Sequence, residues 1–255
     1  MKINIFLILF SSSLFAQPWY YDFGIGTGSH TIGFSETFLP TPQTNGGTAR
    51  VRVGTGSGSF NLENQSITFG EESYLRAVAP TGSSVNKFSI YDYTPGKAFT
   101  IQFTIRFGDV DGSSTGAESG NWYFFAGDGT GFSDNSGFTG SQVFTGVRWA
   151  FGTLGSITTN VRVAGAWTAS GISGTPFTQG NTYTVDIYGN NTTTSATYTY
   201  GSSQSVAANT MDVWVNGSLI ADDIGKALLP GDSNIDSYMF YGESSTGNVA
   251  NIFLG

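Results

Sequence analysis

The sequence contains no cysteine, which excludes disulfide bonds and thiolate-ligated metal sites. Histidine is almost absent too, because His30 is the only one in the chain. Any Ser-His-Asp triad would have to use this residue. It stands in a stretch rich in Gly, Ser and Thr, which predicts a solvated loop histidine rather than a catalytic one.

Charge is also scarce. Charged residues make up 11% of the chain, against about 25% in an average soluble domain. Only 10 residues are basic and the arginines are scattered, whereas 18 are acidic. Nucleic acids and anionic lipids are bound by clustered Lys and Arg. We therefore expect no nucleic-acid partner and no attraction to an anionic membrane surface.

Long hydrophobic runs are missing. The apolar stretch Ile3–Phe10 is far shorter than the about 20 residues that a membrane-spanning helix needs. It follows Lys2 and precedes the small residues of Ser11–Ala16, an order typical of a secretory signal peptide. We predict a signal peptide at residues 1–16, a single domain at 17–255, and a secreted or cell-surface protein that is not inserted in the membrane after cleavage.

Aromatic residues are abundant, at 15% of the chain. Disordered chains are polar as well, but they lack aromatic residues. Each fully buried ring stabilises a fold by on the order of 1.5–3 kcal/mol. The composition therefore predicts a folded domain that needs no crosslinks.

Alternation of apolar and polar residues is the main signal for secondary structure. It is clearest over Phe99–Phe107, where Phe and Ile occupy every second position. Asn216-Gly217 between two apolar triplets predicts a β-hairpin with a type I′ turn, and Asp222–Leu229 could form only a turn or two of helix before Pro230. Further strands are expected at 49–53, 74–79, 88–93, 122–126, 143–151, 157–163, 183–187, 211–216 and 238–241. Many strands without intervening helices predict an all-β, two-sheet antiparallel β-sandwich or jelly roll.

Several short motifs resemble those of exported Bacteroidetes-type proteins with a concanavalin A-like lectin/glucanase, or laminin G-like, jelly-roll domain. The resemblance spans nearly the whole mature chain and implies this fold, but it implies no particular activity. The motifs are 20–24 (YYDFG), 48–53 (TARVRV), 87–93 (KFSIYDY), 132–135 (FSDN) and 212–217 (DVWVNG).

The last residues, Asn251–Gly255, have the pattern of the first part of a closing strand, which in the resembled proteins normally continues with acidic residues. Those proteins often carry further domains and a C-terminal sorting signal. We therefore expect either a fragment, truncated at the C-terminus, or a chain that ends at this strand. A shortened closing strand would leave an edge with unpaired backbone groups.

Catalytic carboxylates are not evident in the sequence. Retaining glycoside hydrolases of this fold carry a Glu-x-Asp-x-x-Glu run on one strand face, with the carboxylates about 5–5.5 Å apart. The chain has no such run: Glu71-Glu72 are neighbours that would point to opposite faces of a strand, and Asp222-Asp223 lie beside a turn. We predict a protein that is not an enzyme.

Metal binding is left as an alternative. Asp109 and Asp111, or Asp128 and Asp134, could supply oxygen ligands for Ca²⁺ from two Gly-rich segments, 109–120 and 128–140, which we expect to be exposed. An EF-hand is not expected at 107–118, because Phe107 occupies its first ligand position and no helices are predicted on either side. Acids that merely solvate these loops are the favoured interpretation.

A glycan-binding surface is the main functional hypothesis. Period-two alternation places Trp214 with Asp212 and Asn216 on a non-core sheet face, and exposed rings beside polar groups suit a pyranose. The same reasoning groups Arg148 with Phe144, Tyr188 with Asp186, and Tyr91 with Tyr93. Loops could equally cover these rings and form a second core.

The preferred function is a secreted, non-catalytic recognition or cell-adhesion module whose partner is an extracellular glycan. The alternatives are a structural surface or matrix module that binds a surface protein, and a divergent polysaccharide hydrolase or lyase.

Overall fold

The computed structural model describes residues 21–43, 46–55, 57–64, 66, 68–70, 72–82, 84–108, 118–243, 248–249 and 251–255. The predicted signal peptide, Glu71, Asp109 and Asp111 lie outside these residues. No helix in the described part of the chain is long and apolar enough to cross a membrane.

The first large sheet has eight strands, and all its described pairings are antiparallel. Their spatial order is β1 (Gly28–His30), β4 (Ser59–Glu63), β5 (Tyr74–Val78), β19 (Asn251–Leu254), β7 (Ala98–Phe107), β12 (Thr182–Asn190), β15 (Thr210–Val215) and β16 (Ser218–Gly225).

The second large sheet has nine strands. Their order is β11 (Ala166–Thr168), β10 (Ile157–Val163), β9 (Val143–Phe151), β8 (Glu118–Gly127), β17 (Ser237–Glu243), β6 (Val85–Tyr93), β3 (Gly46–Val53) and β2 (Gly33–Ser35), with the short β18 (Asn248–Val249) pairing parallel to β8. A separate hairpin is formed by β13 (Ala196–Tyr200) and β14 (Ser202–Val206).

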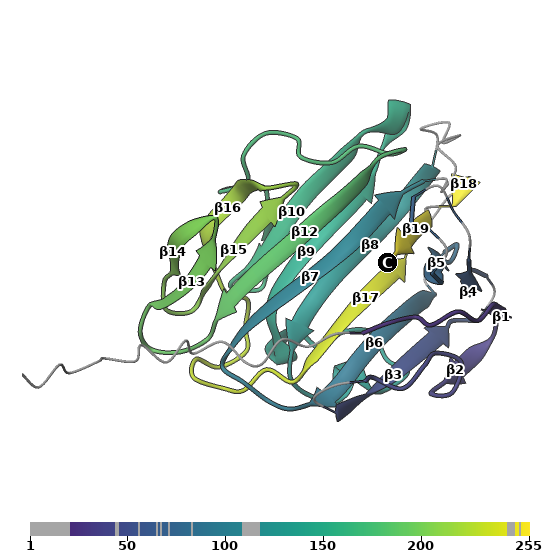
Figure 1. Ribbon diagram of the computed structural model, residues 1–255, viewed down its shortest axis with the longest axis horizontal. Helices are drawn as coiled ribbons and strands as arrows, with labels where there is room; N and C mark the ends of the chain where they lie inside the picture. The colour runs from purple at the N-terminus through teal and green to yellow at the C-terminus, as the bar shows by residue number, and fades with distance from the viewer. Residues whose placement is uncertain are drawn as a thin grey trace, which may run out of the picture.

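The two large sheets pack face to face and enclose the main core (Figure 1), which confirms the prediction of an all-β sandwich. Three short 3₁₀ turns are the helical elements among the described residues: η1 (Thr130–Phe132), η2 (Gly140–Gln142) and η3 (Thr153–Gly155). The expected turn of helix at Asp222–Leu229 is wrong, since β16 continues to Gly225. Asn216 and Gly217 both have positive φ, as the predicted hairpin turn requires.

The alternation of apolar and polar residues predicts the correct sheet face for most side chains. Trp122 and Phe124 enter the main core, whereas Tyr123 and Phe125 pack on the other side of the same strand. Both faces of β8 are therefore buried.

Two backbone irregularities break the alternation. Phe144 was predicted to lie with Arg148, but a register shift between β8 and β9 places Phe144 in the main core against Phe99. Tyr93 was predicted to lie with Tyr91, but Asp92 has φ 57° and Tyr93 packs toward the core. A single irregular residue in a strand moves the side chains of the residues beyond it to the opposite face of the sheet.

Both outer sheet faces are partly covered. The hairpin β13–β14 lies over β12 and β15, and its apolar residues form a small second core with Tyr188 and Trp214. On the nine-stranded sheet, Phe132 and Phe138 of the segment 128–142 pack over Tyr241 and its neighbours. The prediction that 128–140 is a wholly exposed loop is therefore wrong.

Candidate ligand cleft

A gap opens in the eight-stranded sheet where β19 ends. This strand lies between β5 and β7, and its last residues pair with the C-terminal half of β7. Gly255 adds two backbone hydrogen bonds with Thr104, of 3.0 and 3.1 Å. Figure 1 shows that the C-terminus lies in the middle of the sheet rather than at its rim. Among the described residues, no strand pairs with β7 on this side from Ala98 to Phe103.

The gap is the mouth of an open cleft of about 680 Å³. Its walls come from β7, from the segment around Tyr21 and from the residues before β5, and its floor comes from the opposite sheet. The lining residues used below are Tyr21, Asp22, Glu72, Ser73, Tyr93, Thr100, Ile101, Gln102, Phe103, Asp186, Tyr188, Tyr238 and Phe240.

Apolar side chains on the core side of β7 are incompletely covered at this cleft. Ile101 and Phe103 point into the sandwich, where Phe103 contacts Phe240 at a centroid distance of 5.1 Å, yet both remain partly exposed. Ile105, on the same face but beside β19, is fully buried. A ligand that covers this exposed apolar surface would gain about 25 cal/mol for each Å² that it removes from water.

The edge of β7 also presents backbone groups to the cleft. In an antiparallel strand the N–H and C=O groups of alternate residues point to opposite neighbours. Thr104 bonds to Gly255, so Thr100 and Gln102 point their backbone groups the same way, whereas Ile101 and Phe103 point theirs to β12. The hydrogen bonds of the described residues include no partner for these groups of Thr100 and Gln102.

The floor and mouth of the cleft differ in polarity. Tyr93 and Tyr238 on the floor lie 6.3 Å apart, and burial raises the pKa of both hydroxyls, so both stay neutral at physiological pH. At the mouth, the Gln102 amide donates a hydrogen bond to Asp186, whose other oxygen accepts from the Tyr200 hydroxyl at 3.3 Å. The cleft can therefore hold an apolar group on its floor and polar groups at its rim.

The leading glycan candidates from the sequence are not exposed. Trp214 is on the predicted sheet face but is only 9% exposed, because Tyr200 of the hairpin stacks on it at 4.1 Å. Its indole N–H donates to the Tyr198 hydroxyl at 2.9 Å, which in turn donates to Asp212 at 2.7 Å. Trp214 and Asp212 are therefore not exposed for a ligand, and the alternative that outward rings are covered and form a second core is the one that the structure shows here.

Two further candidates lie near this hairpin. Tyr188 lines the cleft, but its ring is mostly covered by Tyr198, which stacks on it at 3.8 Å. Asn216 is exposed in the hairpin turn, where its side-chain oxygen accepts the Thr184 N–H at 2.9 Å. Of the residues that the sequence grouped for glycan binding, Tyr188, Asp186 and Tyr93 line the cleft.

The remaining candidates, Arg148 and Tyr91, lie on the outer face of the opposite sheet. Arg148 donates to Asn160 and lies over the Trp167 ring at 5.4 Å. The Tyr91 hydroxyl donates to Glu36 at 2.8 Å. The structure thus divides the predicted ligand residues between two sheets, and they do not form one site.

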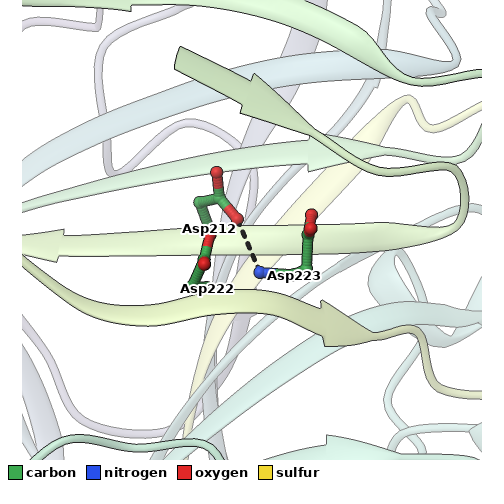
Figure 2. Close-up of side chains that lie close together, drawn as sticks. All are labelled: Asp212, Asp222 and Asp223. Atoms are coloured by element: carbon green, nitrogen blue, oxygen red, sulfur yellow. Dashed lines mark hydrogen bonds between the residues drawn. The ribbon is translucent and has the colours of Figure 1, made fainter.

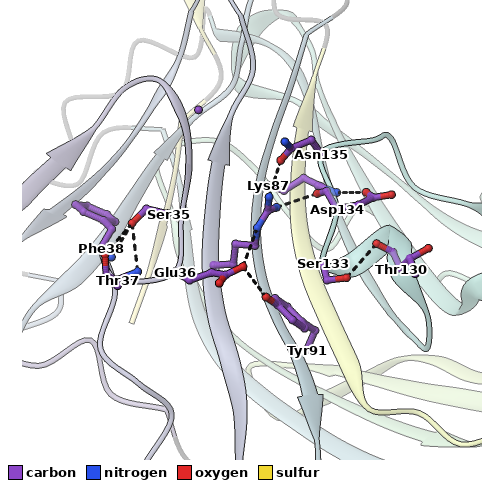
Figure 3. Close-up of polar contacts among 12 residues, drawn as sticks. Ser35, Glu36, Thr37, Phe38, Lys87, Tyr91, Thr130, Ser133, Asp134 and Asn135 are labelled. Atoms are coloured by element: carbon purple, nitrogen blue, oxygen red, sulfur yellow. Dashed lines mark hydrogen bonds and ion pairs between the residues drawn. The ribbon is translucent and has the colours of Figure 1, made fainter.

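Asp134, a predicted calcium ligand, is an ion-pair partner (Figure 3). Its carboxylate lies 3.3 Å from the ammonium of Lys87, which is fully buried and also donates to the Gly131 carbonyl at 3.0 Å. Arg50 donates to the main-chain carbonyl of Asp134 at 2.8 Å. Hydrogen bonds from Ser136 and the charge of Lys87 hold the pKa of Asp134 below its usual value, although burial opposes them.

Asp128 lies near other acids. Burial raises the pKa of Asp236, and the negative charges of Asp128 and Asp92 raise it further. The predicted metal ligands Asp128 and Asp134 therefore have different neighbours, acids for Asp128 and Lys87 for Asp134. Asp109 and Asp111 lie outside the described residues.

An acidic group that the sequence did not single out as a metal site is formed by Asp212, Asp222 and Asp223 (Figure 2). Oxygen atoms of the three lie within 4.8 Å of one another. Burial raises the pKa of Asp212 above its usual value, and the charges of Asp223 and Asp222 add to this rise, whereas hydrogen bonds from Tyr198 and the Asp223 N–H oppose it. Asp212 accepts the Asp223 N–H at 2.8 Å, so this group connects β15 to β16.

His30, the single histidine, lies in β1 beside the Phe38 ring at 5.7 Å and 3.1 Å from the Gly33 carbonyl. It does not line the cleft. The sequence placed Tyr93 on the outer face and did not single out Tyr238, because no local pattern shows which side chains meet between the two sheets.

Comparison with known proteins assigns no family. No protein-family model matches the chain, and no curated protein matches it. The cleft and the residues that line it are therefore the observations on which a function can be proposed.

Proposed function

We propose that this protein is an exported, non-catalytic recognition module that holds an extended ligand in the cleft beside β7. One observation carries the proposal: the core side chains Ile101 and Phe103 stay partly exposed along a strand edge whose backbone groups are unpaired among the described residues. Apolar surface and directional hydrogen-bonding groups side by side favour a linear ligand over a compact one.

The dimensions of the cleft support a binding role. Its volume of about 680 Å³ falls in the range of about 300–1,000 Å³ that is typical of ligand sites. Its apolar floor and polar rim are the usual division of such sites. Export is supported by the sequence of residues 1–16, and the absence of catalysis by the scarcity of histidine and of paired acids in the sequence.

A glycan is the second candidate ligand. The Gln102 amide is exposed at the rim, where it donates a hydrogen bond to the buried carboxylate of Asp186, and an exposed amide can bind sugar hydroxyls. Against it, the other predicted sugar-binding rings are covered by β13–β14.

Covered outer faces also favour a structural surface or matrix role. Both sheets carry satellite clusters of buried rings, which leaves few exposed aromatic side chains for recognition away from the cleft. A purely structural protein would bind no ligand in the cleft. A binding assay therefore distinguishes the structural role from the recognition role.

The test compares the mature protein with a variant whose cleft is blocked, Ile101→Lys. Immobilised polysaccharides and extended, unfolded polypeptides are offered to both proteins, and retention is measured. We expect at least one class of polymer to bind the wild type and to be lost with Ile101→Lys. Retention of every ligand by the variant, or binding of none by the wild type, contradicts the proposal. Release of reducing ends or unsaturated sugars in the same samples would revive a hydrolase or lyase.

A further inference from the structure

We propose that Arg148, Arg162 and Trp167 form a second binding site, which takes two carboxylates of an extended, acidic polypeptide segment of a partner protein. These three residues, the arginine site, come from β9, β10 and β11 and lie on the outer face of the nine-stranded sheet. None of them lines the cleft, so the inference does not depend on what the cleft binds.

Strand pairing places the two arginines side by side. Each stands between residues that pack toward the main core, so both side chains point outward. Asn160 of β10 pairs with Arg148, and Arg162 follows two residues later and pairs with Trp167 of β11. Arg148 and Arg162 are therefore diagonal neighbours on one sheet face, about 7–8 Å apart.

Aromatic rings hold both guanidinium groups in place. The Trp167 ring lies against Gly146 of β9, where an added Cβ would stand 3.3 Å from it. The guanidinium carbons of Arg148 and Arg162 lie 5.4 and 5.3 Å from the centroid of this ring, and that of Arg162 lies 5.0 Å from the Phe138 ring as well. Guanidinium groups fixed against rings lose less entropy when they bind a ligand.

The two positive charges have no acidic partner among the described residues. The ion pairs there include neither arginine. Arg148 donates only to the neutral amide of Asn160, at 3.2 and 2.5 Å. Burial lowers the pKa of Arg162, but a guanidinium stays charged at physiological pH. Partly buried charges normally have a counter-charge, and an anion from outside the chain would supply it here.

Unused N–H groups face solvent at this site. Arg148 bonds to Asn160 through Nε and Nη2, which leaves its Nη1. For Arg162 the described contacts include no hydrogen bond, and Nε is its only unpaired nitrogen that is fully enclosed. The terminal nitrogens of Arg162 are therefore open to a ligand. Their planar N–H groups match the two oxygens of a carboxylate in charge-assisted hydrogen bonds.

The spacing of the arginines favours two carboxylates from an extended chain. Side chains of residues i and i+2 in a strand point to the same side and lie about 6.6 Å apart. This distance is close to the separation of Arg148 and Arg162. A partner segment with the pattern Glu-x-Glu or Asp-x-Asp therefore fits both guanidinium groups.

A sugar acid fits the site less well. A pyranose stacks on a free aromatic face, but the Trp167 ring is already surrounded. Tyr123 and Phe125 lie at centroid distances of 5.3 and 5.9 Å from it, and the two guanidinium groups lie over it as well. The site therefore offers N–H groups rather than a stacking surface.

Local charge outweighs the acidity of the whole chain at this site. The formal net charge is −8, but charges farther away than about 8 Å are largely screened at physiological ionic strength. Glu243 of the same sheet accepts a hydrogen bond from Tyr123 at 2.7 Å and forms no ion pair with either arginine. Binding should weaken as salt is raised from about 0.1 to about 1 M.

The probe is the peptide Thr-Glu-Thr-Glu-Thr with blocked ends, titrated into the ¹⁵N-labelled mature protein. The readout is the NMR shift of the Nε–H signals of Arg148 and Arg162 and of the Trp167 indole N–H, and we expect these shifts to saturate. The matched peptide Thr-Gln-Thr-Gln-Thr should bind about tenfold more weakly or less, because its amides carry no charge. Thr-Glu-Glu-Thr-Thr keeps the charge but directs its carboxylates to opposite sides, so it should bind at least about threefold more weakly.

Two variants of the protein complete the test. Arg162→Gln should weaken binding of Thr-Glu-Thr-Glu-Thr about tenfold or more. Arg76→Gln is the matched control, because it removes the same charge from β5 in the other sheet, where Arg76 lies 3.6 Å from Glu63. It should leave the affinity unchanged. Circular dichroism and thermal unfolding establish that both variants are folded, and the comparison of peptides needs no variant.

Several outcomes would overturn the inference. Equal binding of the Glu and Gln peptides, or no shift at the arginines, removes the carboxylate site. An equal loss of affinity in Arg76→Gln would show that net charge alone attracts the peptide. Shifts at Gln102 and Phe103 in place of the arginines would place the peptide in the cleft. Oligogalacturonate is offered in parallel, and its binding at the arginines without peptide binding would assign the site to an acidic glycan.

Discussion

Lys87 offers a quantitative test of the packing on the nine-stranded sheet. Its side chain is fully buried, and burial lowers its pKa from 10.5 to about 8, although the charge of Asp134 opposes the change. Between these two values the unfolded chain binds more protons than the folded one, so stability rises with pH. From about pH 7 to about pH 9 the two pKa values give a gain of roughly 1.3 kcal/mol.

The perturbation is Lys87→Met, which keeps an unbranched side chain and removes the titrating group. Urea unfolding of both proteins across this pH range gives the difference in unfolding free energy at each pH. Burial raises the pKa of tyrosines such as Tyr123 and Tyr241, and their ionisation in the unfolded chain opposes stability at high pH. Because both proteins keep these tyrosines, the difference isolates Lys87.

We expect the wild type to gain about 1.3 kcal/mol relative to Lys87→Met as pH rises from about 7 to about 9. The absolute stability of the variant is not the readout, since it also loses the hydrogen bond to Gly131. A difference that is flat across the range, or that falls with pH, would refute the burial of a charged Lys87.

The remaining predictions concern the hairpin and the candidate metal ligands. Trp214→Ala should cost roughly 3 kcal/mol of unfolding free energy, because it removes the ring that Tyr200 covers; a loss below about 1 kcal/mol in urea unfolding would show an exposed ring. Tyr198→Phe should cost about 1–3 kcal/mol, because it leaves the Trp214 N–H and the Asp212 carboxylate without its hydroxyl. The matched change Tyr200→Phe, which loses a longer hydrogen bond of 3.3 Å to Asp186, should cost less. Millimolar Ca²⁺ should leave the melting temperature unchanged, because Asp134 is paired with Lys87; a rise that EDTA reverses would contradict this.

Much of the architecture follows from local pattern. The period of two over Phe99–Phe107 predicts β7, and the dipeptide Asn216-Gly217 predicts the turn between β15 and β16. Both signals are local consequences of strand geometry and of positive φ in tight turns. They identify strands and faces without any knowledge of the neighbouring strands.

The candidate site could not be predicted in the same way. Alternation places Trp214 on the outer face of β15, but the exposure of that face depends on β13–β14, a hairpin rich in Tyr, Thr and Ser that local apolar alternation did not reveal. The positive φ of Asp92 likewise turns Tyr93 to the core, and its effect becomes visible only in the structure. The cleft itself is lined by residues of β7, of the segment around Tyr21 and of the opposite sheet, which only the tertiary structure brings together.

The most direct test of the central claim is residue-resolved amide hydrogen exchange of the mature protein without ligand. The amides of Ile101 and Phe103, which point to β12, should exchange slowly, whereas those of Thr100 and Gln102 should exchange at least about tenfold faster. Equal protection of all four amides would contradict an open edge on β7, and with it the cleft as a site for an extended ligand.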